Sequence, residues 1–182
     1  GASARRDHDQ DEAAADSAMS RVEPIRICFV CLGNICRSPT AEGVMQHLTR
    51  SAGIADCFEI DSAGTGAYHV GERADSRSRA EALRRGVPLT SRARLFVAED
   101  FERFDYLIAM DRQNYRDMQR LARDPALLRK LHLLRSFDNA AAGSPDVPDP
   151  YHDAADGFAR VYDICEVGCR GLLQHLRTTH DL

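Results

Sequence analysis

Residues 31–37, Cys-Leu-Gly-Asn-Ile-Cys-Arg, place a thiol and a guanidinium group at the two ends of a short segment. Cys31 can serve as a nucleophile, and Arg37 is a planar, two-pronged donor that suits phosphate oxygens. Gly33 and Asn34 tolerate unusual backbone dihedrals, so the chain between the two ends can curl tightly with its amide hydrogens inward. Such a loop binds anions, and its amides and Arg37 favour the thiolate form of Cys31.

A strand and a helix are expected on either side of this loop. Residues 25–31 form a short apolar run bounded by turn residues, which predicts a buried strand. Ser38 is a good N-cap and Pro39 fits the first helical position, so a helix should follow at once. The spacing Cys-x5-Arg alone has little specificity. Its position between a strand and a helix makes it informative.

A phosphate monoester needs a proton on its leaving oxygen, and therefore a general acid. Residues 143–151 hold three prolines among polar residues, which predicts a stiffened loop. Asp149 precedes Pro150, which biases Asp149 toward extended dihedrals and fixes the direction of its carboxyl group. From these residues alone Asp146 competes with Asp149, and turn formation explains either of them.

Two motifs together resemble the low-molecular-weight protein tyrosine phosphatase family over about residues 24–177: the segment from Cys31 to Pro39, and Asp149-Pro150-Tyr151. The resemblance implies a protein tyrosine phosphatase in which Cys31 attacks phosphorus to form a phosphocysteine. Arg37 and the loop amides would hold the phosphate oxygens, and Asp149, in preference to Asp146, would act first as general acid and then as base. No metal or other cofactor is expected, because Arg37 and the backbone dipoles neutralise the charge.

The resemblance also implies supporting and rim residues. Ser38 should hydrogen-bond the thiolate, Asn34 and Ser62 should brace the loop, and Asp111 lies on a recurrent family motif, although helix capping also explains it. Aromatic walls for a phosphotyrosine ring are expected from the rim. The expected set is Cys31, Arg37 and Asp149 for catalysis, Leu32, Gly33, Asn34, Ile35, Cys36 and Ser38 in the phosphate loop, Ser62 and Asp111 in support, and Tyr68, Tyr151 and His152 at the rim.

Four other kinds of protein share part of this pattern. Thiol-dependent arsenate reductases use a similar loop but need two further reactive cysteines after the third strand, and residues 110–143 contain none. Protein arginine phosphatases lead us to expect Thr at position 35, where this chain has Ile35. A phosphate-binding protein without activity would keep the loop and not require Asp149. A metal site built on Cys28, Cys31 and Cys36 lacks a nearby fourth ligand.

Composition limits the remaining possibilities. The 182 residues suit one domain, which we place at residues 24–182, with residues 1–23 as a disordered extension. The net charge of −4 gives no reason to expect nucleic acid or an anionic membrane as a partner. The partners expected are a phosphotyrosine protein as substrate and inorganic phosphate as product, and the chain is expected to be a monomer.

Six cysteines without a signal peptide or a long apolar run indicate a reducing cytoplasm. Within the loop, Cys36 is expected to form a protective disulfide with Cys31 under peroxide.

The remaining apolar patterns alternate between strands and helices. Strands are expected at 25–31, 57–62, 105–110 and 131–134. Helices are expected after Ser38 until Gly53, at 76–85 through Ala80 and Leu83, at 111–123, and at 154–177. This alternation predicts an α/β fold, a single three-layer domain with a four-stranded parallel sheet and helices on both faces. Ligands bind such sheets beyond the carboxyl ends of the strands, where the phosphate loop lies.

Overall fold

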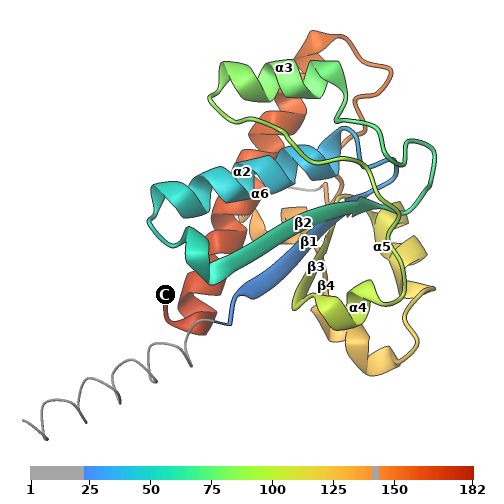
Figure 1. Ribbon diagram of the computed structural model, residues 1–182, viewed down its shortest axis with the longest axis vertical. Helices are drawn as coiled ribbons and strands as arrows, with labels where there is room; N and C mark the ends of the chain where they lie inside the picture. The colour runs from blue at the N-terminus through green and yellow to red at the C-terminus, as the bar shows by residue number, and fades with distance from the viewer. Residues whose placement is uncertain (1–22, 141–143) are drawn as a thin grey trace, which may run out of the picture.

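The computed structural model describes residues 23–140 and 144–182 and consists of one parallel sheet between helices (Figure 1). The four strands lie in the order β2-β1-β3-β4, and all three neighbouring pairs are parallel. Their bounds are Ile25–Cys31 for β1, Phe58–Gly64 for β2, Tyr106–Ala109 for β3 and Leu131–Leu133 for β4. The predicted fold class is confirmed. The predicted disordered extension falls, apart from Glu23, on residues outside the described part of the chain.

In the described ranges, four longer helices and several short ones lie between the strands or follow the last of them. The longer helices are α2 (Arg37–Ser51), α3 (Ser76–Arg84), α5 (Arg112–Gln119) and α6 (Ala155–His180), and the short α4 spans Asp100–Arg103. The 3-10 helices are η1 (Ala55–Cys57), η2 (Pro125–Lys130) and η3 (Leu134–Phe137).

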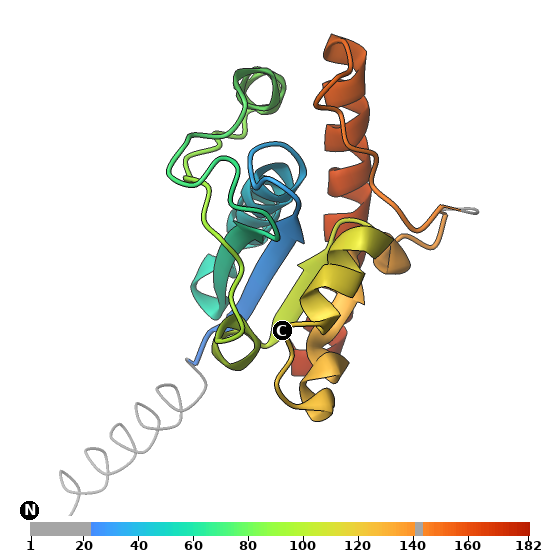
Figure 2. The same ribbon diagram turned by 90° about the vertical axis from the view of Figure 1, so that its right-hand side faces the viewer.

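Each face of the sheet has its own apolar core, because side chains of β1 alternate between the faces. Ile27 and Phe29 are fully buried and belong to the core that β1 shares with α2 and α6. Cys28 and Val30 point the other way and pack with Phe101 of α4 and residues of β3 and α5. Figure 2 shows the sheet between these two groups of helices. A strand buried on both faces reads as a nearly continuous apolar run, which is why residues 25–31 were recognisable.

The order of the strands places the phosphate loop where a ligand can enter. The chain pairs β2 with one edge of β1 and β3 with the other, so the connections diverge on the two sides of β1. In a doubly wound sheet this divergence leaves a crevice at the carboxyl end of the strand. The loop from Leu32 to Cys36 starts at that end of β1 and leads into α2.

Three local predictions were wrong. Helix α2 begins at Arg37, with Cys36 at its N-cap and no side-chain capping bond, because the Ser38 hydroxyl bonds residues of the phosphate loop instead. Helix α3 buries Ser78, Glu81 and Ala82, while Leu83 is 68% exposed. Helix α5 ends at Gln119 and not at residue 123, since the next apolar side chain, Leu121, is 40% exposed and gains little from packing. In the described ranges, no helix is both long and apolar enough to cross a bilayer.

Candidate active site

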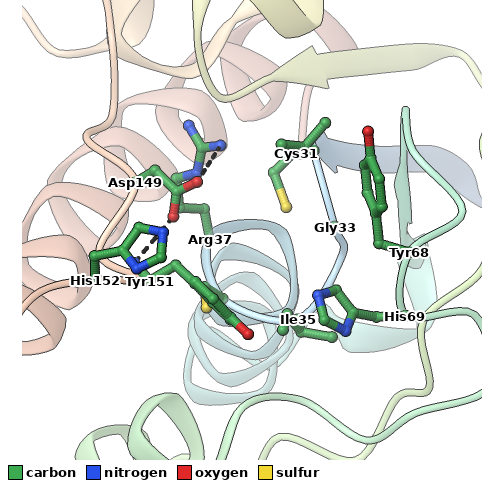
Figure 3. Close-up of a pocket in the computed structure, with 11 residues that line it drawn as sticks. Cys31, Gly33, Ile35, Arg37, Tyr68, His69, Asp149, Tyr151 and His152 are labelled. Atoms are coloured by element: carbon green, nitrogen blue, oxygen red, sulfur yellow. Dashed lines mark hydrogen bonds and ion pairs between the residues drawn. The ribbon is translucent and has the colours of Figure 1, made fainter.

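A pocket of about 430 Å³ lies at the carboxyl end of β1 (Figure 3). Figure 3 shows Asp149 and His152 on one side of the pocket, Tyr68 and His69 on the other, and Cys31 between the two sides. Segments far apart in the sequence therefore meet here. The lining residues are Cys31, Leu32, Gly33, Ile35, Cys36, Arg37, Tyr68, His69, Asp149, Tyr151 and His152.

Cys31 is the last residue of β1, and its side chain is 2% exposed. Its Sγ lies 3.0 Å from Oγ of Ser38, in the first turn of α2. The Asn34 side-chain amide donates to the same Ser38 oxygen at 2.8 Å. The hydroxyl hydrogen of Ser38 can therefore point to the sulfur at 3.0 Å or to the Ala63 carbonyl oxygen, which is farther away at 3.4 Å. The first N–H groups of α2 have no partner within the helix, so this end of the helix also favours a negative charge.

Asn34 holds the loop in its curled shape. Its φ of 55° lies in the left-handed region, which asparagine tolerates better than most residues. Its side-chain nitrogen also donates to Ser62 Oγ at 2.9 Å, and its side-chain oxygen accepts from the backbone N–H of Arg94 at 3.0 Å. Gly64 allows the close approach, because a Cβ there would lie 2.7 Å from the carbonyl oxygen of Leu32. The loop is therefore anchored to the end of β2.

A buried carboxylate, missed from the sequence, continues this hydrogen-bond chain. Glu42 of α2 is 7% exposed and accepts from Ser62 Oγ at 2.5 Å. Burial raises the pKa of the Glu42 carboxyl above its ordinary value, although hydrogen bonds from Ser62 and Ser91 oppose the shift. The bonded chain thus runs from Glu42 through Ser62, Asn34 and Ser38 to Cys31. The sequence contains no local pattern that points to Glu42, because its hydrogen-bond partner Ser62 lies 20 residues further along the chain.

Arg37 is 3% exposed, and its guanidinium group is held from three directions. One terminal nitrogen donates to Asp111 Oδ2 at 2.6 Å and to the Val147 carbonyl at 3.0 Å. The other lies 3.7 Å from Oδ2 of Asp149. Burial alone would lower the pKa of Arg37, but Cys31, Asp111 and Asp149 outweigh it and raise that pKa. A guanidinium fixed in this way presents its donors to the pocket without having to be ordered by a ligand.

Asp111 caps a helix and also contacts Arg37. It is the N-cap of α5, and its Oδ1 accepts from the backbone N–H of Asn114 at 2.7 Å in a capping box. Its other oxygen holds Arg37. The cap therefore fixes the carboxylate, and the carboxylate fixes the arginine.

The two competing aspartates of the proline-rich loop lie in different places. Asp146 accepts from Arg112 at 3.0 Å, and this pairing lowers the pKa of Asp146, so it stays ionised and away from the pocket. Asp149 lines the pocket and faces Arg37. Between them Val147 is buried, and its N–H donates to Met110 O at 2.8 Å, which fixes the loop to the end of β3.

The rim of the pocket is aromatic. Tyr68 is 76% exposed and Tyr151 is 41% exposed, and both line the pocket, as does His152. His69 also lines it and pairs through Nδ1 with Glu72. Its ring lies 6.0 Å from that of Tyr151 between centroids. Sequence reasoning did not select His69; its position next to Tyr68 in a glycine-bounded loop was the available signal.

The six cysteines are all free thiols, and they differ in how their surroundings affect the pKa of each thiol. Burial raises the pKa of Cys36 and of Cys165 to about 12, and it also raises the pKa of Cys28 and Cys169. The raised pKa values keep these four thiols protonated at neutral pH. Pairing of Cys36 with Cys31 under oxidation stays a prediction. In the part of the chain that the structure describes, no three His, Cys, Asp or Glu side chains gather as a metal site.

Comparison with known proteins gives concordant similarities. Residues 26–181 match the family described as low molecular weight phosphotyrosine protein phosphatase. A low molecular weight protein-tyrosine-phosphatase of Streptomyces coelicolor is 44% identical over 153 residues, which cover 84% of this chain and 93% of the relative.

Two solved structures are similar over most of the chain. A protein tyrosine phosphatase of Entamoeba histolytica has 39% identity and a TM-score of 0.81, covering 85% of this chain and 98% of the other. A Drosophila arginine phosphatase has 31% identity and a TM-score of 0.78, covering 84% of this chain and 98% of the other.

Proposed function

This chain belongs to the low molecular weight phosphotyrosine protein phosphatase family, and we propose that it hydrolyses phosphotyrosine and other aryl phosphate monoesters through a phosphocysteine on Cys31. One observation carries the proposal. A thiol, a buried guanidinium and an acidic side chain line one pocket, with Arg37 and Asp149 3.7 Å apart. These three groups are what phosphoryl transfer to a cysteine requires: a nucleophile, a charge clamp and a proton donor.

In the first step the Cys31 thiolate attacks phosphorus, and the bond from phosphorus to the phenolic oxygen breaks. Arg37 holds the phosphoryl oxygens as negative charge spreads over them. The phosphate dianion displaces the Asp149 carboxyl group from its position 3.7 Å from Arg37. The dianion favours protonation of the displaced carboxyl group, which then passes its proton to the leaving phenolate.

In the second step Asp149, now ionised, takes a proton from water, and the water oxygen attacks phosphorus. The bond from sulfur to phosphorus breaks and inorganic phosphate leaves. Ser38, at 3.0 Å from the sulfur, stabilises the departing thiolate by donating its hydroxyl hydrogen. The same hydrogen bond therefore favours the reactive form of Cys31 before attack and its release after hydrolysis.

The rim favours a flat aromatic group. Tyr68 and Tyr151 both line the pocket, so a phosphotyrosine ring that enters between them gains stacking on aromatic faces. Ile35 of the phosphate loop lines the pocket, and its side chain offers an apolar contact instead of a hydrogen bond. A phosphoserine side chain has no ring and gains no such stacking.

Phosphoarginine is the second candidate substrate, because one of the similar structures is an arginine phosphatase. A guanidinium leaving group is polar and would need a hydrogen-bonding side chain near the loop, whereas position 35 is isoleucine. We therefore expect phosphotyrosine to be preferred.

The test compares hydrolysis of three peptides that share one sequence and carry phosphotyrosine, phosphoserine or phosphoarginine. We expect kcat/KM for phosphotyrosine to exceed the other two by at least about 100-fold. Higher turnover of phosphoarginine would contradict the substrate assignment. Cys31→Ser, run alongside, identifies any turnover that does not depend on the thiol.

Three further proposals concern the whole chain. We place the phosphatase domain at residues 24–182. We also propose that the chain is a monomer and that it works in the cytoplasm. Six free cysteines support the last proposal, since thiols persist in a reducing environment.

A further inference from the structure

The segment from residue 71 to residue 93 has a charge opposite to that of the chain as a whole. It holds six arginines and three carboxylates, whereas the chain has a net charge of −4. The segment consists of α3 and the two stretches that flank it. These two stretches are joined by backbone hydrogen bonds from Gly71 N to Ala93 O at 2.8 Å and from Ala93 N to Glu72 O at 2.9 Å.

The carboxylates of this segment already have partners. Glu72 pairs with His69, Asp75 with Arg77, and Glu81 with Arg84 and Arg85. The pairing of Asp75 with Arg77 is bidentate, at 3.0 and 2.9 Å, and it lowers the pKa of Asp75. These acids are therefore not available to the other three arginines of the segment.

The remaining three, Arg73, Arg79 and Arg92, form what we call the arginine ribbon. In the described ranges none of them lies within 4.0 Å of a carboxylate oxygen. Arg73 and Arg92 are paired across an antiparallel bridge, so their side chains leave the backbone toward one face. Like charges in this relation destabilise a fold. Arg79 adds a third charge nearby. Its Nε donates at 2.9 Å to the carbonyl oxygen of Ala74, the residue that follows Arg73.

The arginine ribbon is continuous with the wall of the pocket. The N–H of Asp75 donates to the carbonyl of the pocket residue Ile35 at 2.8 Å. Ala93, which follows Arg92, is buried against Ile35 and Cys36. An extended peptide spans about 3.3–3.6 Å per residue, so residues a few positions from a phosphotyrosine in the pocket come within reach of these long side chains.

We infer that the arginine ribbon selects phosphotyrosine peptides that carry Asp or Glu within a few positions of the phosphotyrosine. Arg92 donates to the Gly71 carbonyl at 3.0 Å, but among the described residues no carboxylate lies close enough to offset the repulsion between Arg73 and Arg92, which an acidic segment would reduce. Figure 3 shows the acidic side chain of Asp149 on the side of the pocket away from His69, so an acidic peptide is favoured on the arginine side. This inference rests on the proposed function and names the substrate class that the site prefers.

The test measures kcat/KM on three phosphotyrosine peptides: one with acidic residues before the phosphotyrosine, one with acidic residues after it, and one with Gln in their place. The variant is R73E/R92E, and both positions are exposed. The matched control is R50E/R129E, which makes the same charge change at exposed sites on the end of α2 and on η2. Turnover of p-nitrophenyl phosphate reports whether the pocket itself is intact.

We expect the wild-type enzyme to prefer at least one acidic peptide over the Gln peptide by about 5- to 10-fold at low salt, and less at high salt. R73E/R92E should lose or reverse this ratio and keep p-nitrophenyl phosphate turnover, while the control keeps the ratio. An equal ratio in wild type and R73E/R92E would overturn the inference, as would an equal loss in the control. If no phosphotyrosine substrate is hydrolysed at all, the proposed function itself fails.

Discussion

At the scale of single residues, Asp149 separates a phosphatase from a protein that only binds phosphate. Asp149→Asn keeps the size of the side chain and removes the proton donor. We expect turnover of phenyl and alkyl phosphates to fall by about 10² to 10⁴. Inorganic phosphate should bind as tightly as to wild type or more so, because the carboxylate no longer competes for Arg37 at 3.7 Å.

Asp146→Asn is the matched control, since Asp146 lies on the same loop and pairs with Arg112. Kinetics on phenyl phosphate, with phosphate as inhibitor, measure both quantities. Unchanged turnover in Asp149→Asn, or an equal loss in Asp146→Asn, would remove Asp149 from the mechanism.

Glu42 gives a prediction for the pH dependence of stability. Burial raises the pKa of its carboxyl in the folded state, so the protonated form is favoured by folding. This contribution to the free energy of unfolding is complete below the unfolded pKa of about 4.3 and is lost as the pH rises through the folded pKa. Glu42→Gln keeps an acceptor for Ser62 and removes the charge. It should therefore lose less stability than wild type between about pH 4 and pH 8.

Urea unfolding at a series of pH values measures this difference, with the exposed Glu59→Gln as control. A difference between Glu42→Gln and wild type that does not change with pH would show that the ionised form of Glu42 costs nothing in the fold.

At the scale of elements, packing against η3 limits the size of the side chain that α6 can hold at position 171. Alanine favours a helix over glycine by about 1 kcal/mol. At Gly171, however, a Cβ would lie 1.9 Å from the carbonyl oxygen of Phe137, a backbone atom that cannot move aside alone. We expect Gly171→Ala to destabilise the fold by about 1–3 kcal/mol through overpacking, with turnover per folded molecule unchanged.

Gly157→Ala makes the same change on the same helix, where the Cβ would lie 2.5 Å from the Cβ of Asp153. Asp153 is exposed in the turn that precedes α6, so a small shift of that turn relieves the contact. Thermal unfolding of the two variants should give shifts of opposite sign or of clearly different size. A stabilised Gly171→Ala would show that α6 and η3 separate more readily than their packing indicates.

The elements differ in how well the sequence predicts them. Strand β1 is buried on both faces, so its apolar run was distinctive, and Gly53 and Gly86 take positive φ just beyond the helices that they were expected to end. The N-cap prediction for Ser38 was wrong because its hydroxyl bonds Cys31, the contact that the family resemblance implied. Leu83 was misassigned because α3 buries Ser78 and Glu81 in preference to it. In both cases a tertiary contact outweighed the local preference.

At the scale of the whole molecule, contacts between distant residues build the site. The loop residues were visible because they are contiguous and lie between a strand and a helix. The bonds that hold Arg37 join it to Asp111, 74 residues away, and to Val147, 110 residues away. Local patterns contain no trace of such pairs, so the positions of Asp111 and Asp149 came from a family resemblance. Glu42 and His69, for which no motif was recognised, were missed.

The domain assignment gives a prediction at the same scale. Every residue of the two apolar cores and of the pocket lies between Ile25 and Leu176. A chain that begins at Glu23 should therefore keep the melting temperature and the p-nitrophenyl phosphate turnover of the full chain. Thermal unfolding and kinetics on both forms check this. A fall in either quantity would mean that residues 1–22 belong to the working domain.

The most direct test of the account is turnover of p-nitrophenyl phosphate by wild type and Cys31→Ser in the presence of a chelator. The account predicts full wild-type activity under these conditions, because Arg37 and the main-chain dipoles supply the positive charge. It also predicts a loss of at least about 10⁴-fold in Cys31→Ser, since the nucleophile is gone. Comparable turnover by Cys31→Ser, or wild-type activity that returns only with added divalent ions, would contradict it.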